Sequence, residues 1–237
     1  MIQMSKKVAK NLINPIYMVD GSKGGVGKSI VCMALLDYLQ AIGMSFLFIE
    51  TDGTNPDVYK CYGEAGTAVT LNLDIDDGWI DLVDLSEQHQ DKVVVINTGA
   101  RNSDGVKKYG KTLLNILEDL ERSLVTLWVI NRDLDSVNLL KKYMDTMQDT
   151  VIHVIRNEKE GDESKFAIYN GSEVRKTVEL TGKTLNFNRL ADRAASLMYN
   201  DRKAIKAALE SAPLGLKAEL TRWRNENQKI FAQIIKS

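Results

Sequence analysis

The sequence predicts an α/β fold: a doubly wound, mostly parallel sheet with helices on both faces. Two observations predict this fold. Short apolar runs alternate with segments of helical period along most of the chain, an order typical of parallel strands joined by crossover helices. A glycine-rich turn, Gly21 to Gly27, also joins the first apolar run to the first helical segment. With 237 residues, of which 44% are hydrophobic, the chain can bury the core of one large domain.

Each expected strand is a run of apolar or β-branched residues that ends at a polar residue or a turn. The expected strands cover residues 16–19, 45–50, 69–73, 93–96, 124–130, 151–155 and 184–187. Each expected helix has apolar residues three or four positions apart. These helices cover residues 29–42, 79–89, part of 102–122, 136–147, 172–180, 190–199, 204–209 and 216–237. Residues 1–237 are thus expected to form a single P-loop domain, with 1–14 as a lead-in segment and 216–237 as a C-terminal helix.

Composition and charge argue against several classes of protein. The formal net charge of −1 provides no global basic field for nucleic acid or an anionic membrane. No run of about 18 apolar residues is present, so no segment is expected to span a bilayer. The two cysteines, Cys32 and Cys61, lack metal-ligand spacing and are expected to be reduced thiols in a cytoplasmic protein. His89 and His153 add no supporting cluster, so a zinc site is not expected.

The most informative stretch is YMVDGSKGGVGKS, residues 17–29. An apolar strand, a glycine-rich turn and a helix start follow one another here, which is the context of a phosphate-binding P-loop. Glycines let the backbone point N–H groups at phosphate oxygens, and the helix N-terminus adds partial positive charge. Lys28 would reach the β- and γ-phosphates, and the Ser29 hydroxyl would bind Mg²⁺. The motif predicts nucleotide binding by Gly24, Gly25, Val26, Gly27, Lys28, Ser29 and Ile30.

A second lysine distinguishes this loop from the general motif. Ser22 stands where the general pattern has its first glycine, and Lys23 opens the string KGGVGKS. This string resembles the deviant Walker A motif of the ParA/MinD family of P-loop ATPases. The resemblance implies ATP and Mg²⁺ as cofactors and an ATP-sandwich homodimer in which Lys23 reaches the partner's phosphates. It also implies a slow, partner-stimulated ATPase of the small ParA-like kind, acting in plasmid partition, conjugative mobilisation or positioning.

Two acids at the end of the second expected strand match further family positions. Glu50 and Asp52 stand where relatives carry a D-x-D pair, and strand alternation would point both side chains at the phosphate loop. The resemblance assigns Asp52 to the carboxylate that orients the attacking water, so Lys23, Lys28 and Asp52 are the expected catalytic residues. It assigns Glu50, with Ser29, to the surroundings of Mg²⁺. The alternative is that both acids only cap a strand-to-helix turn.

The sequence departs from the family at the end of the fourth expected strand. Relatives carry an aspartate there that holds a Mg²⁺-bound water, whereas this chain has Asn97. Asparagine can accept a hydrogen bond from such a water but brings no charge, so hydrolysis is expected to be slow or very weak. At the end of the sixth strand, Asn157 matches the residue that reads the adenine edge in the family. Residues 54–57 match a switch loop that senses the γ-phosphate.

The expected partners are a second copy of the chain in the presence of ATP and a further protein. Non-specific DNA is another candidate, because Arg101, Lys107, Lys108 and Lys111 gather positive charge before one helix. The C-terminal helix carries an apolar face that is expected to dock on the domain, with a partner contact as the alternative and membrane binding disfavoured. Two other functions stay open: an ATP-binding adaptor with little hydrolysis, and a metabolic ATP-dependent enzyme of the same P-loop group.

Overall fold

A computed structural model describes residues 14–21, 23–99 and 103–235 of the chain. Several features of the sequence-based prediction lie outside these residues. They are the lead-in segment up to residue 13, Ser22, Arg101 and the last two residues of the expected C-terminal helix, 236–237. Within the described ranges, no helix has both the length and the apolar content needed to cross a bilayer.

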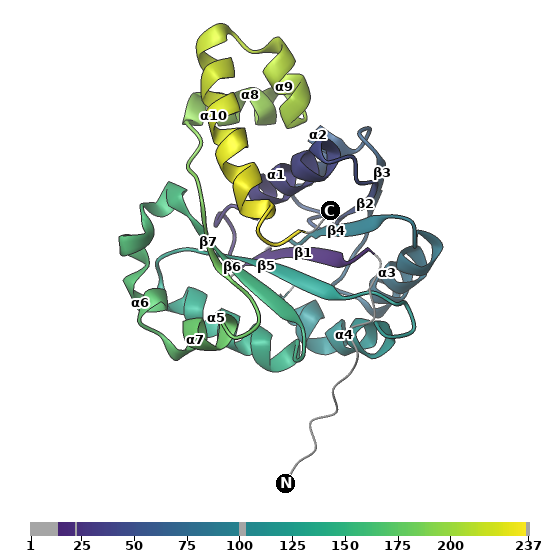
Figure 1. The fold of residues 1–237 in the computed structure, drawn as a ribbon. Coiled ribbons are helices and arrows are strands. Elements are labelled where there is room, and N and C mark those ends of the chain that lie inside the picture. The colour runs from purple at the N-terminus through teal and green to yellow at the C-terminus, as the bar shows by residue number, and fades with distance from the viewer. Residues whose placement is uncertain (1–13, 22, 100–102, 236–237) are drawn as a thin grey trace.

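One parallel sheet forms the centre of the molecule. Its strands are β1 (Ile16–Gly21), β2 (Phe46–Glu50), β3 (Thr67–Thr70), β4 (Val93–Asn97), β5 (Leu124–Ile130), β6 (Val151–Asn157) and β7 (Thr184–Phe187). Among the described residues, these seven strands are ordered β3-β2-β4-β1-β5-β6-β7, and each neighbouring pair is parallel (Figure 1). The predicted parallel sheet is therefore confirmed, and β1 lies at its centre.

Helices follow the strands and cover both faces of the sheet. They are α1 (Lys28–Ala41), α2 (Asp57–Tyr62), α3 (Asp76–Gln88), α4 (Ser103–Ile116), α5 (Leu134–Thr146), α6 (Ala167–Asn170), α7 (Glu173–Val178), α8 (Asp192–Asp201), α9 (Ile205–Ser211) and α10 (Leu214–Phe231). Short 3₁₀ turns at Glu158–Glu160 and Glu163–Phe166 occupy the charged segment after β6.

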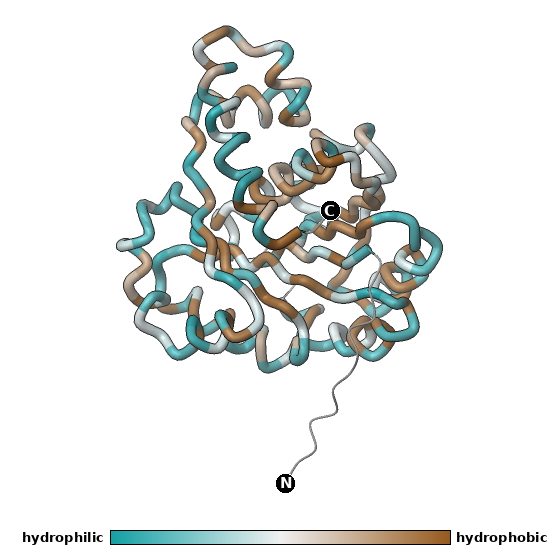
Figure 2. Tube along the Cα trace, viewed as in Figure 1, coloured by the Kyte–Doolittle hydropathy of each residue, from teal (hydrophilic) through white to brown (hydrophobic). Residues whose placement is uncertain are grey.

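Two hydrophobic cores lie on opposite faces of the sheet. Along β1, Tyr17 and Val19 point into one core, whereas Ile16 and Met18 point into the other, as strand alternation requires. The first core packs against α1, α2 and α8–α10, and the second packs against α3–α7. Figure 2 shows apolar residues along the central strands and more polar residues on the outer surface. The prediction of helices on both faces is confirmed.

Some element bounds differ from the sequence-based prediction. β5 and β7 have the predicted bounds, but β3 begins two residues before the expected 69–73 and ends at Thr70. The short helix α2, which buries Val58 and Tyr62, follows directly from the expected switch loop and was not predicted. α10 begins at Leu214 and ends at Phe231, so it is displaced toward the N-terminus relative to 216–237.

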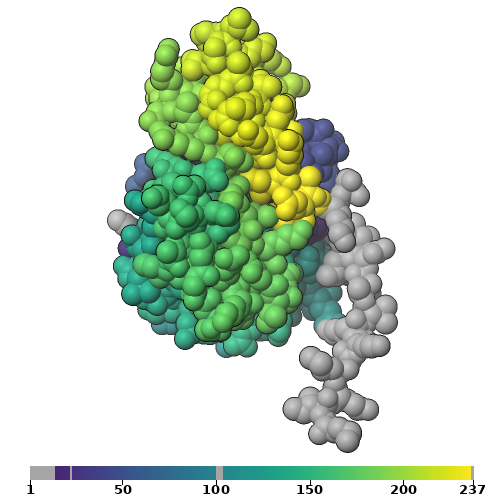
Figure 3. All heavy atoms as spheres, turned by 60° about the vertical axis from the view of Figure 1, so that its left-hand side comes forward, coloured from purple at the N-terminus to yellow at the C-terminus, as the bar shows by residue number. Residues whose placement is uncertain are grey.

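The C-terminal helices form a lobe beside α1, the helix that follows the glycine-rich turn. α10 lies along α1, with α8 and α9 packed beside it (Figures 1 and 3). Buried Leu220, Trp223 and Phe231 hold α10 in the first core. Arg224 Nε also donates a hydrogen bond of 2.7 Å to Oδ2 of Asp37 on α1, whose side chain is only 2% exposed. The C-terminal helix thus docks on the domain.

Candidate functional site

The glycine-rich loop between β1 and α1 forms one wall of the candidate site. Gly25 (φ +82°) and Gly27 (φ +103°) adopt left-handed conformations that other residues rarely adopt. Because α1 begins at Lys28, the unpaired N–H groups of its first turn lie at the loop. Lys28 is buried, and its Nζ donates a hydrogen bond of 3.1 Å to the backbone O of Lys23. This arrangement is suited to an anion such as phosphate.

Asn157, at the end of β6, braces this loop. Its Nδ2 donates to the backbone O of Val26 at 2.9 Å, and its Oδ1 accepts from the backbone N–H of Lys159 at 3.1 Å. A Cβ placed on Gly27 would lie 2.2 Å from Asn157 Nδ2, so this contact requires glycine. One amide hydrogen of Asn157 is left for a base, and adenine recognition by this residue stays a prediction.

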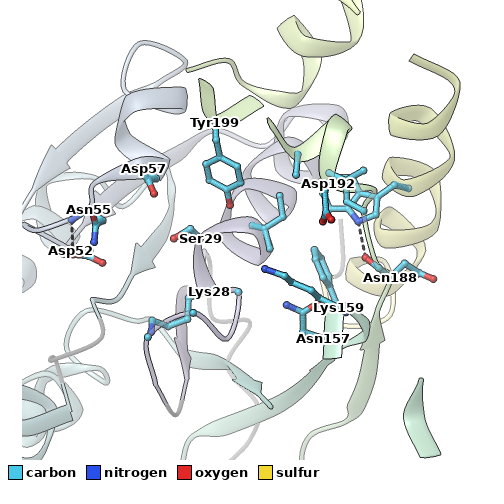
Figure 4. A pocket seen from close by; sticks show the side chains of 18 of the residues that line it. Lys28, Ser29, Asp52, Asn55, Asp57, Asn157, Lys159, Asn188, Asp192 and Tyr199 are labelled. Carbon is cyan, nitrogen blue, oxygen red and sulfur yellow. Dashed lines mark hydrogen bonds between the residues drawn. The ribbon is translucent and has the colours of Figure 1, made fainter. Parts of the chain in front are cut away.

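A cavity of about 410 Å³ opens in front of the loop. Figure 4 shows side chains from the loop, from the region after β2, from the ends of β6 and β7 and from α8 converging on it. Val26 is buried beneath the loop and does not line the cavity. The other residues expected to bind nucleotide all line it: Gly24, Gly25, Gly27, Lys28, Ser29, Ile30 and Asn157.

Aromatic residues form the far wall of the cavity. From the sequence they were expected in the core or were not singled out. Tyr199 reaches down from α8 toward Ser29 (Figure 4), and burial raises the pKa of its phenol. Trp223 of α10 donates from Nε1 to the backbone O of Asn188 at 2.7 Å and meets the Phe187 ring edge-on, with centroids 5.7 Å apart. Since these residues come from separate segments, their amphipathic spacing predicts only burial. No local signal places them at a cavity.

Lys23 lies at the edge of the loop and is ion-paired within its own chain. Its Nζ is 2.9 Å from Oδ2 of Asp135 and 3.7 Å from Oδ2 of Asp133, both near the start of α5. The hydrogen bond to Asp135 raises the pKa of Lys23. Both acids are well exposed, so this pairing is open to competition from other anions.

Glu50 is buried below the cavity and does not line it. Its Oε1 accepts hydrogen bonds from Asn97 Nδ2 at 2.8 Å and from the backbone N–H of Asp52 at 3.1 Å. Its Oε2 accepts from the backbone N–H of Tyr59 at 3.3 Å. Burial raises the pKa of Glu50, while these hydrogen bonds lower it. The carboxylate thus ties the ends of β2 and β4 to α2, and its expected place beside Mg²⁺ stays a prediction.

Asn97 has one buried polar atom without a partner. Its amide nitrogen is committed to Glu50, while Oδ1 makes no hydrogen bond to the described residues. Such a buried acceptor carries a desolvation cost unless a further donor meets it. The atom therefore remains available to a bound water.

Asp52 combines the two interpretations that the sequence leaves open. Its Oδ1 accepts from the backbone N–H groups of Thr54 and Asn55 at 3.1 and 2.9 Å, so it caps the turn before α2. Asp52 also lines the cavity on the side facing Lys28 and Ser29 (Figure 4). The turn fixes the carboxylate in a position where it could orient a water, and its catalytic role stays a prediction.

Asp20 and Thr98 are further polar residues at this end of the sheet that sequence reasoning missed as site residues. Asp20 is the residue before the glycine-rich turn, and Thr98 follows Asn97. Thr98 lines the cavity, and its Oγ1 lies 2.7 Å from Oδ1 of Asp20. The available signal was the position of an acid at the end of the central strand, next to the phosphate loop.

The donor set fits a magnesium nucleotide. The described residues contain no cluster of three or more His, Cys, Asp or Glu side chains able to hold a metal by themselves. Mg²⁺ in nucleotide sites takes much of its coordination from phosphate oxygens and water, with only one or two protein oxygens. Ser29, Asp52 and Thr98 provide oxygen atoms along the cavity.

Comparisons with known proteins find a sequence relative and solved structures of similar fold. No protein-family profile matches the sequence. The chain is 52% identical to "Protein MobD" of Acidithiobacillus ferrooxidans over 221 residues, which cover 93% of this chain and 97% of that protein. In structure it resembles a ParA family ATPase from Chlorobium tepidum, with a TM-score of 0.55, 12% identity and coverage of 90% of this chain and 98% of that one. It also resembles a chain of the MinC:MinD cell division protein complex of Aquifex aeolicus, with a TM-score of 0.52, 12% identity and coverage of 94% and 98%.

Proposed function

This chain belongs to the MobD family and has the fold of the ParA/MinD ATPases, and from that premise we propose that it is an ATP-dependent dimerisation switch. Two copies would associate when each holds Mg·ATP, and slow hydrolysis would separate them. The role that fits best is DNA transfer of the plasmid mobilisation or partition kind, exercised through a further protein.

One observation carries the proposal: Lys28, Ser29 and Asp52 converge on a single cavity in front of the glycine-rich loop (Figure 4). Burial lowers the pKa of Lys28, whereas the charges of Asp20 and Asp52 raise it. A triphosphate in the loop would add negative charge beside this ammonium group and favour its charged form. The site is therefore built to accept a polyanion.

Magnesium would be held by the Ser29 hydroxyl together with phosphate oxygens and water. The ion would neutralise phosphate charge as it develops during hydrolysis. Asp52, fixed by the N–H groups of Thr54 and Asn55, would orient the attacking water. Because Asn97 carries no charge, less negative charge lies near the metal than in relatives with aspartate there, and hydrolysis would be slow.

Lys23 would connect nucleotide binding to association. In the single chain its ammonium group pairs with Asp135 at an exposed site. Exposed pairs of this kind stabilise a protein little, so the phosphates of a second subunit can replace Asp135 as the partner. Lys23 would then neutralise charge on the nucleotide of that subunit.

The test is the solution mass measured by light scattering with Mg·ATP, with Mg·ADP and without nucleotide. We expect the 26.5 kDa chain to double in mass only with Mg·ATP. Lys23→Ala should abolish the doubling while retaining nucleotide binding. Lys176→Ala is the matched control, because Lys176 forms an exposed ion pair with Glu173 on α7, away from the cavity. The same mass in all three states, or equal behaviour of both variants, would contradict the switch.

An adaptor that binds ATP with little hydrolysis is the second candidate. The contact between Asn97 and Glu50 favours it, because the amide that replaces the family aspartate is turned toward a buried carboxylate. Single-turnover measurement of ADP release separates the two functions. An ATP-dependent dimer that persists without turnover, with and without duplex DNA, would favour the adaptor.

A further inference from the structure

The end of the central strand carries a buried acid, Asp20, next to the candidate site. Asp20 is 4% exposed and lies one residue beyond Val19, which pairs with Asn97 in the neighbouring strand. Asp20 thus sits beside the position where relatives carry their metal-side aspartate. In this chain, the carboxylate is on β1 and the amide is on β4.

The hydrogen bonds of Asp20 use its oxygen but do not require its charge. Oδ1 accepts from the backbone N–H of Gly21 at 2.7 Å and from Thr98 Oγ1 at 2.7 Å. An asparagine could present the same oxygen to both donors. Burial raises the pKa of Asp20, and the nearby Lys28 lowers it. A change of Asp20 to asparagine would therefore isolate the effect of its charge, part of which acts on the buried Lys28 ammonium group.

Thr98 connects Asp20 to the cavity. Its single hydroxyl hydrogen is directed at acceptors behind it, either Asp20 Oδ1 at 2.7 Å or the backbone O of Val19 at 3.1 Å. Toward the cavity, Thr98 Oγ1 can therefore only accept a hydrogen bond or donate a lone pair to a cation. Ser29 and Lys28 line the same cavity.

We propose that Asp20, acting through the Thr98 hydroxyl, supplies the negative charge beside Mg²⁺ that Asn97 does not supply. Asp20 is a positioning residue: it orients the Thr98 hydroxyl and makes its oxygen a better acceptor for a metal-bound water. This inference rests on the proposed binding of a magnesium nucleotide at the loop.

Titration of a fluorescent, non-hydrolysable ATP analogue, once with Mg²⁺ and once with EDTA, tests the inference. Asp20→Asn should reduce the gain in affinity that Mg²⁺ provides by about tenfold or more, as expected for a partner behind the metal ligands. Its affinity in EDTA should be unchanged or higher, because a negative charge near the phosphates is removed. A purely structural role of Asp20 would not produce a loss of affinity that is confined to Mg²⁺.

Thr98 provides matched variants. Thr98→Val removes the hydroxyl at nearly constant shape and should reproduce the loss caused by Asp20→Asn, whereas Thr98→Ser should retain the magnesium effect. The double variant should be no weaker than either single variant, because both act through one contact. Ser86→Ala is the control for loss of a buried hydroxyl, since Ser86 on α3 donates to the backbone O of Leu82 and does not line the cavity.

The outcomes separate this inference from the proposed function. If the unaltered protein does not bind the analogue, the proposed function fails. If it binds with a magnesium effect that Asp20→Asn leaves intact, or if affinity falls equally in Mg²⁺ and EDTA, the role of Asp20 is overturned. Loss of the magnesium effect in Glu50→Gln but not in Asp20→Asn would assign the charge to Glu50 instead. Should Asp20→Asn fail to fold, Thr98→Val and Thr98→Ser decide the matter.

Discussion

Replacing Arg224 with methionine should lower the free energy of unfolding by about 2–3 kcal/mol. Arg224 Nε donates to Asp37 Oδ2 at 2.7 Å, and the Asp37 side chain is 2% exposed. Removing one partner of a buried ion pair costs about 3–5 kcal/mol, because the other charge stays buried without compensation. The Arg224 side chain is 26% exposed, and Gln228 still donates to Asp37 Oδ2 at 3.2 Å. Both facts reduce the expected cost.

Two further variants test whether the loss of stability arises because Asp37 is left as an unpaired buried charge. Asp37→Leu combined with Arg224→Met should be within about 1 kcal/mol of the unaltered protein, because removing both charges also removes their desolvation cost. Arg222→Met on the same helix is the matched control: Arg222 pairs with Glu219 and Glu226 at the surface. Its loss should cost less than about 1 kcal/mol.

Urea unfolding followed by circular dichroism measures these differences. A loss of 2–3 kcal/mol should lower the Tm by roughly 5–10 °C in a domain of this size. The reasoning is refuted if Arg224→Met and Arg222→Met cost the same. It is also refuted if the double variant is less stable than Arg224→Met alone.

Three further predictions test separate parts of the structure. Gly27→Ala should lower nucleotide affinity at least tenfold in the fluorescence titration, because a Cβ there meets both a left-handed φ of +103° and a neighbouring side-chain amide at 2.2 Å. Gly25→Ala has open space around it and should lose less; equal losses would contradict this steric argument. Burial lowers the pKa of His153 from 6.5 to about 4, so the unfolded state binds the proton more readily, and stability should fall as pH drops from about 6.5 to 4, by up to about 3 kcal/mol. Urea unfolding across that range should show the decline, and His153→Gln should flatten it. Asp135→Asn removes the closer of the two acids that pair with Lys23 and leaves Asp133 at 3.7 Å. It should lower the dimer dissociation constant with Mg·ATP roughly two- to tenfold in light scattering, whereas an unchanged constant would show that the pair does not compete.

Long apolar runs made the sheet predictable. β5 and β7 have the bounds that their continuous apolar or alternating residues predict. The bounds of β3 were harder to predict from the sequence. This strand has only four residues, lies at the edge of the sheet and is only partly buried, so its residues resemble those of the following loop. α2 is one and a half turns long, and its two buried residues, Val58 and Tyr62, are too few to show a period.

The site was predictable where it is local in sequence. The P-loop is contiguous, and of its residues 24–30, which are expected to bind nucleotide, all but Val26 line the cavity. Strand alternation placed Glu50 and Asp52 on one side, but β2 ends at Glu50 and alternation does not extend to Asp52. The pairing of Glu50 with Asn97 joins residues 47 positions apart and has no sequence signal. The ion pair of Lys23 with Asp135 spans 112 positions and was invisible for the same reason.

The central position of β1 in the sheet also determines how late its neighbouring strands become available during synthesis. On the ribosome β1 emerges before the other described strands, yet one of its neighbours, β5, begins at Leu124, about 100 residues later. At about 5–20 residues per second, that interval lasts roughly 5–20 s. Until then the apolar residues of β1 lack a neighbour on one side, and an unpaired strand edge readily joins other chains. A nascent chain stalled before Leu124 would therefore present an unpaired strand edge that a chaperone could cover.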